Sequence, residues 1–385
     1  MVKRMKLRLI ELFAGYGSQA MALKRINADF ESWRVVEFDK FAIKSYNAVH
    51  GTDYEPMDIM QIHAADLGIC DTDKYLYMMT YSFPCTDLSV AGKMAGMEKG
   101  SGTRSGLLWE VERLLKEIVE SGGELPQILF MENVPQVHGK KNKKAFGEWA
   151  GFLNSIGYTN FMEDLNAVDY GIPQNRKRCF MFSFLDCDII YQFPEPMPLE
   201  TSAEGLLENG VDERYYINTG KARNIIEQLI KSGQVLTSKR QELCDGTIKN
   251  PGTRTIANTI TAKDRVIGTR SGEGNCAIVK RLGNIYGFDG GNYAGNVYDV
   301  NGLSPTIRTY QGGNAMPLIV WQYRIRKLTP RECGRLMGVS DEDIDKMAAV
   351  NSNTQLYKQF GNSIVVDVMC AMFEQLELDK KGEGG

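Results

Sequence analysis

A cysteine follows a proline at the end of an apolar run, and this position suits a nucleophile. The run extends from Tyr75 to Phe83, has the length of a buried strand, and is followed directly by Pro84 and Cys85. A strand that stops at a proline places the next residues on a loop at the rim of a sheet, where open α/β folds carry out their chemistry. The alternative is that Cys85 is a small buried hydrophobe, which is the more common state of a free cysteine.

A glycine turn and a later glutamate indicate a site for an adenosine cofactor. The turn Phe13-Ala14-Gly15-Tyr16-Gly17-Ser18 joins a strand-like segment to a helical one, so backbone amides there can approach a ligand closely. Glu37 ends the second strand, where its carboxylate can accept hydrogen bonds from both ribose hydroxyls, and Phe38 can lie against the adenine ring. The glycines are too few for the G-x-G-x-x-G fingerprint of a dinucleotide fold, which favours S-adenosylmethionine over NAD. The alternative is a tight turn followed by a surface glutamate.

The elements that must hold these groups alternate between strands and helices in the first half of the chain. Strand-like segments cover residues 7–13, 33–38, 75–83 and 127–131. Apolar residues at helical spacing cover 19–26, 107–120 and a stretch that ends near Val49. This βαβ pattern predicts an α/β, Rossmann-like fold with a mainly parallel sheet and helices on both faces.

The residue composition of the sequence changes after about residue 186. Glycine, asparagine and threonine become frequent there, and short β-like pieces are separated by glycine-rich turns. Helical character returns at 329–337 and from residue 363 to about 376, and we expect the last helix to pack on the first domain. The prediction is a catalytic domain of residues 1–186 plus 326–378, and a smaller, irregular, β-rich domain of residues 187–325.

Composition sets limits on the class of protein. The chain has 385 residues, of which 43% are hydrophobic and 24% charged, as in globular proteins. Eight cysteines without a close C-x-x-C pair and only three histidines predict no metal site and reduced, cytoplasmic thiols. No apolar run reaches the roughly 20 residues of a membrane helix, and no signal peptide is recognisable. Net charge is −3, but basic residues cluster at 140–144, 176–178 and 324–335, where they could meet a polyanion.

Eight ordered segments resemble the motifs of the cytosine-5 DNA methyltransferase family of bacterial or phage type. They are the segment from Glu11 to Ser18, Glu37-Phe38-Asp39, Met57-Asp58-Ile59, Phe83-Pro84-Cys85, Met131-Glu132-Asn133-Val134, Gln174-Asn175-Arg176-Lys177-Arg178, the segment from Arg326 to Cys333 and the segment from Tyr357 to Ser363. The motifs span nearly the whole chain, and the middle region matches least. The resemblance implies an S-adenosylmethionine-dependent methyltransferase domain with a smaller target recognition domain.

The resemblance also implies a reaction, the transfer of a methyl group to carbon 5 of a cytosine flipped out of a specific duplex DNA sequence. Carbon 5 becomes reactive only after a nucleophile adds to carbon 6, and Cys85 would supply it. Glu132 ends an apolar strand, where burial raises a glutamate pKa, and would donate to ring nitrogen 3. Arg176 and Arg178 are the cations available to favour the thiolate. Arg178 would also hold the carbonyl oxygen of the base, and Asn133 would order the loops around Cys85.

Further contacts are carried over from the family. The residues expected to contact S-adenosylmethionine are Phe13, Ala14, Gly15, Gly17, Glu37, Phe38, Asp58, Ile59, Pro84, Asn362 and Ser363. Those expected to contact DNA are Ser89, Lys93, Arg104, Thr306, Gly312 and Gly313. The glycine-rich segment 86–106 reads as a mobile loop that closes over the flipped base. We expect a monomer that binds double-stranded DNA, either alone or beside a cognate restriction endonuclease.

The sequence departs from the family pattern at three positions, and it is also compatible with two alternative functions. Glu11 replaces the usual aspartate, Ser82 the usual glycine and Thr86 the usual glutamine, but none of these removes a reacting group. One alternative is methylation of cytosine in transfer RNA, since a branch of the family shares these motifs. The other is a homologue that binds DNA but has lost turnover.

Overall fold

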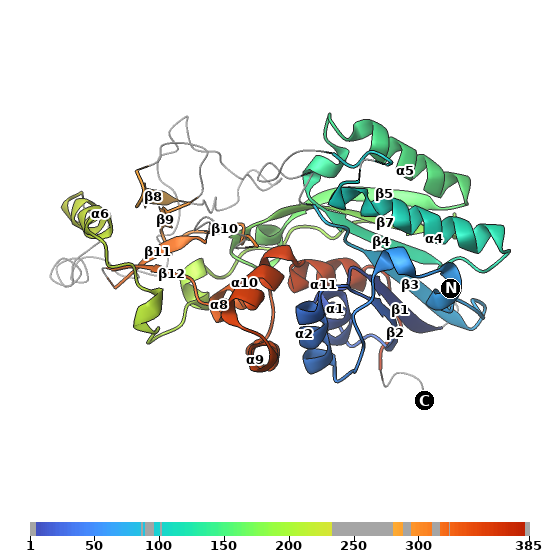
Figure 1. Cartoon of the computed structure of the whole chain (residues 1–385), viewed down its shortest axis with the longest axis horizontal. Helices are drawn as coiled ribbons and strands as arrows, with labels where there is room; N and C mark the ends of the chain where they lie inside the picture. The colour runs from blue at the N-terminus through green and yellow to red at the C-terminus, as the bar shows by residue number, and fades with distance from the viewer. Residues whose placement is uncertain are drawn as a thin grey trace.

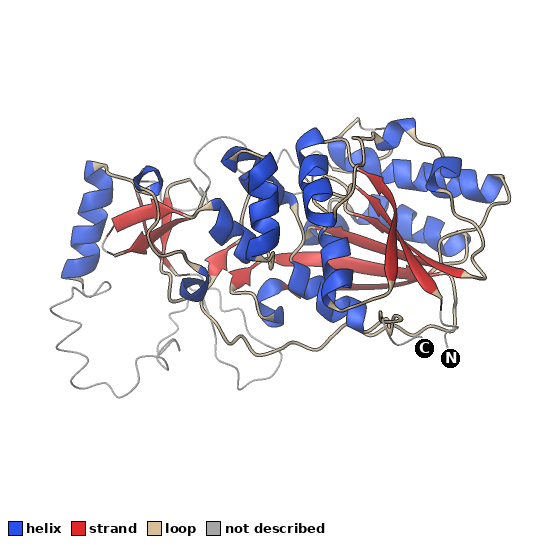
Figure 2. Cartoon of the chain, turned by 90° about the horizontal axis from the view of Figure 1, so that it is seen from below, coloured by secondary structure: helices blue, strands red, loops and turns tan. Residues whose placement is uncertain are grey.

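The computed structural model describes residues 5–85, 88, 96–100, 102–232, 280–287, 294–309, 316–322 and 324–381. A large sheet with helices on both faces forms one end of the molecule, and a smaller sheet with one helix forms the other (Figure 1). Both ends of the chain lie beside the large sheet (Figure 2). The predicted α/β fold class, with a mainly parallel sheet and a smaller β-rich part, is confirmed.

The large sheet has the strand order β2-β1-β3-β4-β7-β5. Its strands are β1 (Lys6–Leu12), β2 (Phe30–Val36), β3 (Tyr75–Tyr81), β4 (Ile128–Asn133), β5 (Thr159–Asn166) and β7 (Lys177–Phe184). The pairs among β1 to β4 are parallel, whereas β7 runs antiparallel to both β4 and β5. Because of this reversal, the start of β7 lies at the same edge of the sheet as the carboxyl ends of β1 to β4.

Alternating apolar residues along each strand bury both faces of this sheet. Leu129 and Met131 of β4 pack under α4 (Leu108–Glu120) and α5 (Lys143–Ser155), whose Trp149 is fully buried. Phe130 of β4 points to the other face, towards α1 (Ser18–Arg25) and α11 (Val366–Glu374). Its ring centroid is 5.2 Å from that of Phe373 in α11. The C-terminal helix therefore completes the core of the sheet that the N-terminal strand begins (Figure 1).

The smaller sheet has the order β12-β11-β9-β8 and mixed direction. Its strands are β8 (Arg281–Asn284), β9 (Asn296–Tyr298), β11 (Leu318–Trp321) and β12 (Arg324–Lys327), and α6 (Gly220–Lys231) packs on it. The predicted domain boundary between residues 325 and 326 thus falls inside β12. A short parallel pair, β6 (Gln174–Asn175) with β10 (Ser304–Pro305), joins the two halves of the molecule.

The remaining helices lie around the large sheet or between the two sheets. They are α2 (Lys40–His50), α3 (Ala64–Leu67), α8 (Pro330–Arg335), α9 (Asp341–Val350) and α10 (Asn353–Asn362), with short 3₁₀ turns η1 (Ile59–Gln61), η2 (Arg104–Leu107), η3 (Pro135–His138), η4 (Ala167–Tyr170), η5 (Ala203–Leu206) and η6 (Glu213–Tyr215). Arg326 of β12 and Glu332 of α8 form a fully buried ion pair at 2.7 Å.

Within the described ranges, no helix has both the length and the apolar character needed to span a bilayer.

Gly361 of α10 gives a test of how the two halves meet. A Cβ atom at this position would collide with the backbone of Arg308 and Thr309, which follow β10. We therefore expect Gly361→Ala to lower the free energy of unfolding by about 1–3 kcal/mol, measured by denaturant titration.

Gly147, exposed in the interior of α5, is the matched control because a Cβ there meets nothing within 4 Å. Gly147→Ala should raise the free energy of unfolding by about 0.5–1 kcal/mol, because alanine favours the helix. Equal effects of the two substitutions would show that the contact at Gly361 does not constrain the fold.

Candidate active site

Cys85 lies on the loop after β3, at the carboxyl edge of the large sheet. Its thiol is half-buried, and it packs against the core beneath α4. Burial raises the thiol pKa, and the nearby Glu132 carboxylate raises it further, whereas Arg178 and Arg176 lower it. The structure therefore places all three charged groups within electrostatic reach of one partly accessible sulfur.

Glu132 and Arg178 form the second part of the site. Glu132 is the penultimate residue of β4 and Arg178 the second residue of β7, and their side chains lie on the same face of the sheet, with Arg178 Nε 3.2 Å from Glu132 Oε1. Burial raises the pKa of Glu132, while the two arginines oppose that shift. Arg178 remains 14% exposed, so its guanidinium can face both the carboxyl and the space outside the sheet edge.

Arg176 occupies a different position from the one expected of a cation that faces the substrate. Its side chain is 2% exposed, and its terminal nitrogens donate to the carbonyls of Ile307 (2.9 Å), Gly361 (3.0 Å) and Ser363 (2.5 Å). Burial, followed by repulsion from Arg178, lowers its pKa to about 9. Arg176 thus acts on Cys85 through its charge while its hydrogen bonds hold the segments after β10 and α10.

Two amides hold the loops of the site. Asn133 Nδ2 donates to the carbonyl of Phe83 at 2.9 Å, which ties the end of β4 to the segment that carries Cys85. Gln174 is fully buried; its Nε2 donates to the carbonyl of Leu336 and its Oε1 accepts from the amide of Ile307. The role of Gln174 was missed from the sequence, although the residue lies in the recognised segment 174–178, because its partners are more than 130 residues away.

The predicted cofactor turn has the backbone that close ligand approach requires. Gly15 adopts φ +59° with open space where a Cβ would be, and its amide donates to Glu37 Oε2 at 2.9 Å. The amide of Asp39 donates to the other oxygen of Glu37 at 2.7 Å. Phe38 is 74% exposed beside this carboxylate, so its ring is available to a flat apolar partner.

A buried polar cluster forms the floor beneath this turn. Tyr46 donates to Glu11 Oε2 at 2.6 Å, and His50 Nε2 lies 3.2 Å from the carbonyl of Tyr16. Burial raises the pKa of Glu11 to about 7 and lowers that of His50 to about 4. Gly17 has φ +79° directly above the rings of Tyr46 and His50, where no side chain would fit.

The other predicted cofactor residues surround the same sheet edge. Phe13 and Ala14 belong to the turn after β1; Phe13 has φ +58°, and the amide of Ala14 donates to the carbonyl of Val36. Asp58 caps η1 through the amide of Met60, and Ile59 is buried behind it. The Pro84 carbonyl accepts from Ser105 at 2.7 Å. At the end of α10, Asn362 is exposed and Ser363 is half-buried.

The predicted DNA contacts are placed less completely. Arg104 begins η2, after the glycine-rich segment, and Thr306 donates from its hydroxyl to the carbonyl of Asn175 at 2.6 Å. The structure therefore sets Thr306 next to β6, one residue from Arg176. Ser89, Lys93, Gly312 and Gly313 lie outside the described residues.

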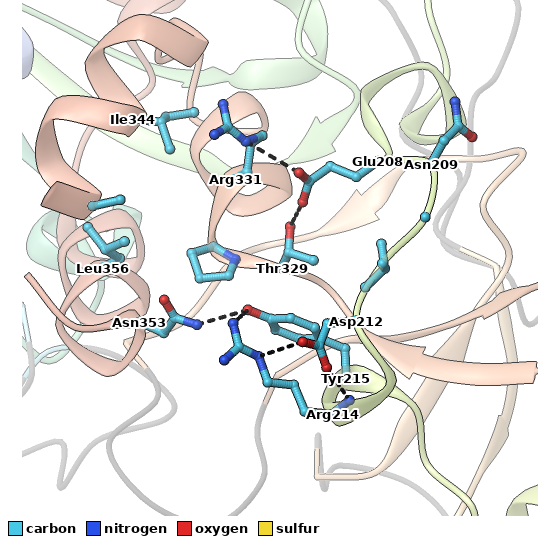
Figure 3. Close-up of a pocket in the computed structure, with 14 residues that line it drawn as sticks. Glu208, Asn209, Asp212, Arg214, Tyr215, Thr329, Arg331, Ile344, Asn353 and Leu356 are labelled. Carbon is cyan, nitrogen blue, oxygen red and sulfur yellow. Dashed lines mark hydrogen bonds and ion pairs between the residues drawn. The ribbon is translucent and has the colours of Figure 1, made fainter.

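A separate cavity of about 260 Å³ lies between the segment 208–215 and helices α8, α9 and α10 (Figure 3). Its polar side chains are paired, since Arg331 lies 3.3 Å from Glu208 and Asn353 donates to Tyr215 Oη at 2.8 Å. Its described lining includes none of the predicted site residues. We interpret it as a space at the interface between the two halves of the molecule.

Comparison with known proteins agrees with this geometry. Residues 7–378 match the model of the family described as C-5 cytosine-specific DNA methylase. The Type II methyltransferase M2.ScrFI of Lactococcus lactis subsp. cremoris is 31% identical, over 96% of this chain and 99% of its own length. The Type II methyltransferase M.HhaI of Haemophilus parahaemolyticus is 30% identical, over 94% and 92%.

A solved structure shows the same fold. The S. pombe Dnmt2 methyltransferase superposes with a TM-score of 0.62 at 17% identity, covering 96% of this chain and 98% of that one. The match of the family model over nearly the full length, with Cys85, Glu132 and Arg178 assembled at one sheet edge, identifies the chain as a member of the C-5 cytosine-specific DNA methylase family.

Proposed function

We propose that this chain transfers a methyl group from S-adenosylmethionine to carbon 5 of a cytosine in duplex DNA, through a transient adduct on Cys85. The observation that carries the proposal is the grouping of a half-buried thiol, a buried carboxyl and a guanidinium at one edge of the sheet. These are the groups that cytosine requires, because its carbon 5 is a poor nucleophile until the ring is converted to an enamine.

In the first step the Cys85 thiolate adds to carbon 6 of the base. The new sulfur–carbon bond pushes an electron pair through the ring towards carbon 5 and nitrogen 3. Arg178 and Arg176 favour the thiolate, because they lower a thiol pKa that burial alone would raise. After methylation, the proton on carbon 5 passes to solvent and its bonding electrons restore the double bond between carbons 5 and 6. The sulfur then leaves as the Cys85 thiolate, and the proton on nitrogen 3 returns to the Glu132 carboxylate.

Glu132 and Arg178 stabilise the negative charge that develops on the ring. A carboxyl whose pKa is raised by burial keeps its proton to higher pH, and can donate it to nitrogen 3. Arg178 lies 3.2 Å from that carboxyl and is partly exposed, which suits it to hold the neighbouring carbonyl oxygen of the base. The roles of Asn133 and Arg176 are to position these groups through the loops that they bind.

The residues at the carboxyl ends of β1 and β2 fit S-adenosylmethionine. The open backbone at Gly15, the Glu37 carboxylate and the exposed Phe38 ring offer a close-approach surface, a hydroxyl acceptor and an apolar face. When bound, the cofactor supplies an electrophilic methyl group on a sulfonium. Glu37 would orient the ribose, Asp58 and Ile59 would border the adenine, and Asn362 and Ser363 would close the site from α10.

We also propose that the two halves of the molecule have different functions. Residues 1–186 with 326–378 would bind the cofactor and carry out the reaction, and residues 187–325 would recognise the DNA target. Arg104 and Thr306, which flank the catalytic edge from different segments, would contact the backbone around the flipped base. The protein would act as a cytoplasmic monomer, either alone or beside a cognate restriction endonuclease.

The nucleophile can be tested by Cys85→Ser with matched DNA probes. We expect methyl transfer to fall below about 1% of wild type, because a serine hydroxyl adds poorly to cytosine, while S-adenosylmethionine affinity stays within about twofold. Cys187→Ser, an exposed thiol outside the site, is the control and should be fully active.

Duplex DNA with 5-fluorocytosine at the target adds a direct readout, since fluorine cannot leave as the proton does. Intact-protein mass spectrometry should show a covalent adduct that is absent from Cys85→Ser. Full turnover by the serine variant would contradict the assignment of Cys85 as the nucleophile.

The reaction requires a Cys85 thiolate and a protonated Glu132 carboxyl at the same time, and burial raises the pKa of both groups. Single-turnover methylation should therefore follow a bell-shaped pH profile, in which the rising limb depends on ionisation of the thiol and the falling limb on loss of the Glu132 proton. Glu132→Gln should be slower by at least about 100-fold and lose the falling limb, because an amide does not titrate. Persistence of that limb in the glutamine variant would assign it to another group.

Substrate preference separates this proposal from transfer-RNA methylation. Because the matching family is described as C-5 cytosine-specific DNA methylase, we expect the enzyme to methylate duplex DNA and to leave total transfer RNA unmodified. Bisulfite sequencing of host DNA that carries the gene would give both the modified base and its sequence context. Faster labelling of transfer RNA than of DNA would overturn the choice of substrate, without affecting the assignment of Cys85.

A further inference from the structure

Three side chains with metal-binding atoms converge on the face of the large sheet opposite Glu132. Cys179 of β7 is in register with Asp164 of β5 and with Asn133 of β4, so the three point to the same face. His138, at the end of η3, folds over that face from the segment after β4. The Sγ of Cys179, a carboxylate oxygen of Asp164 and a ring nitrogen of His138 all lie within 4.8 Å of one another.

We propose that His138, Asp164 and Cys179 form a binding site for a borderline-soft divalent cation, with Zn²⁺ as the best match. Zinc accepts nitrogen, oxygen and thiolate ligands together, and three protein ligands with an open fourth position for water are a common arrangement. A neutral imidazole, a carboxylate and a thiolate carry two negative charges, which balance a divalent ion. The sequence predicted no metal site because these residues are not closely spaced, and only strand pairing brings them together.

The access and burial of the three groups fit entry of an ion from solvent. His138 is 34% exposed and Asp164 20% exposed, whereas Cys179 is fully buried behind them. At present His138 Nε2 lies 2.9 Å from Asp164 Oδ1. An ion would replace that hydrogen bond with two coordinate bonds. It would also form a bond to Cys179 Sγ as the S–H bond breaks, and the proton would pass to solvent.

The ammonium group of Lys177 would repel a cation at this site, so its removal is expected to strengthen binding. Lys177 Nζ lies 3.5 Å from Asp164 Oδ2, but its side chain is 56% exposed and can turn away. Lys177→Gln should therefore tighten cation binding, by up to about fivefold. The site lies directly behind the catalytic edge, since Cys179 is in register with Asn133 and adjacent to Arg178 in the chain.

The test is a titration of the full-length protein with Co²⁺, which reports thiolate ligation through its charge-transfer absorption. Cys85→Ser serves as the parent, so that the catalytic thiol cannot contribute. We expect one equivalent to bind with a cobalt–thiolate band, and His138→Ala and Asp164→Asn each to weaken binding by at least about tenfold. In the same parent Cys179→Ser should abolish the band, and Zn²⁺ should displace the cobalt.

The matched control is Cys187→Ser, because Asp186, Cys187 and Asp188 form the other group of potential ligands among the described residues. This variant should bind cobalt like the parent. Absence of the band in the parent, or equal binding by His138→Ala, would overturn the proposal. If Cys179→Ser fails to fold, as judged by circular dichroism, the partly exposed His138 and Asp164 variants decide the outcome.

Discussion

The buried guanidinium of Arg176 is the constraint on which the active site depends. It holds carbonyl groups from the segment after β10 and from the end of α10, at positions 131 to 187 residues further along the chain. A charge with 2% exposure is stable only if such acceptors surround it. The same contacts therefore bring the segment at the end of α10 against the strand that carries Arg178.

The direction of β7 explains why Cys85, Glu132 and Arg178 lie at one edge of the sheet. Parallel strands β1 to β4 deliver their loops, including Cys85, to one edge, and Glu132 ends β4 there. Because β7 is antiparallel, its first residues reach this edge as well, and Arg178 lies 3.2 Å from Glu132. A parallel strand in the same place would have put Arg178 at the far edge of the sheet.

Sequence patterns were sufficient for strands β1 to β4 and helices α1, α2 and α4, because apolar periodicity is local and burial follows it, but they did not indicate β5, α5 or β7. They placed Cys85 on a loop after a buried strand and the glycine turn before a helix, and both placements are observed. They did not reveal the carbonyl clamp of Arg176, the buried Gln174 or the grouping of His138 with Asp164 and Cys179. These depend on strand register and on hydrogen bonds between distant segments, which a single sequence does not encode locally.

The brief β6–β10 pairing has an evolutionary consequence. Two residues from each strand, with Thr306 bonded to Asn175, link the half that holds the smaller sheet to the strand that leads into Arg178. The described chain between residue 216 and β10 packs on the smaller sheet, where α6 covers it and β9 pairs with β11, and not on the large one. Under the proposed roles of the two halves, this part can diverge or be exchanged while Cys85, Glu132 and Arg178 stay in place, so a lineage would change its target sequence without changing its chemistry.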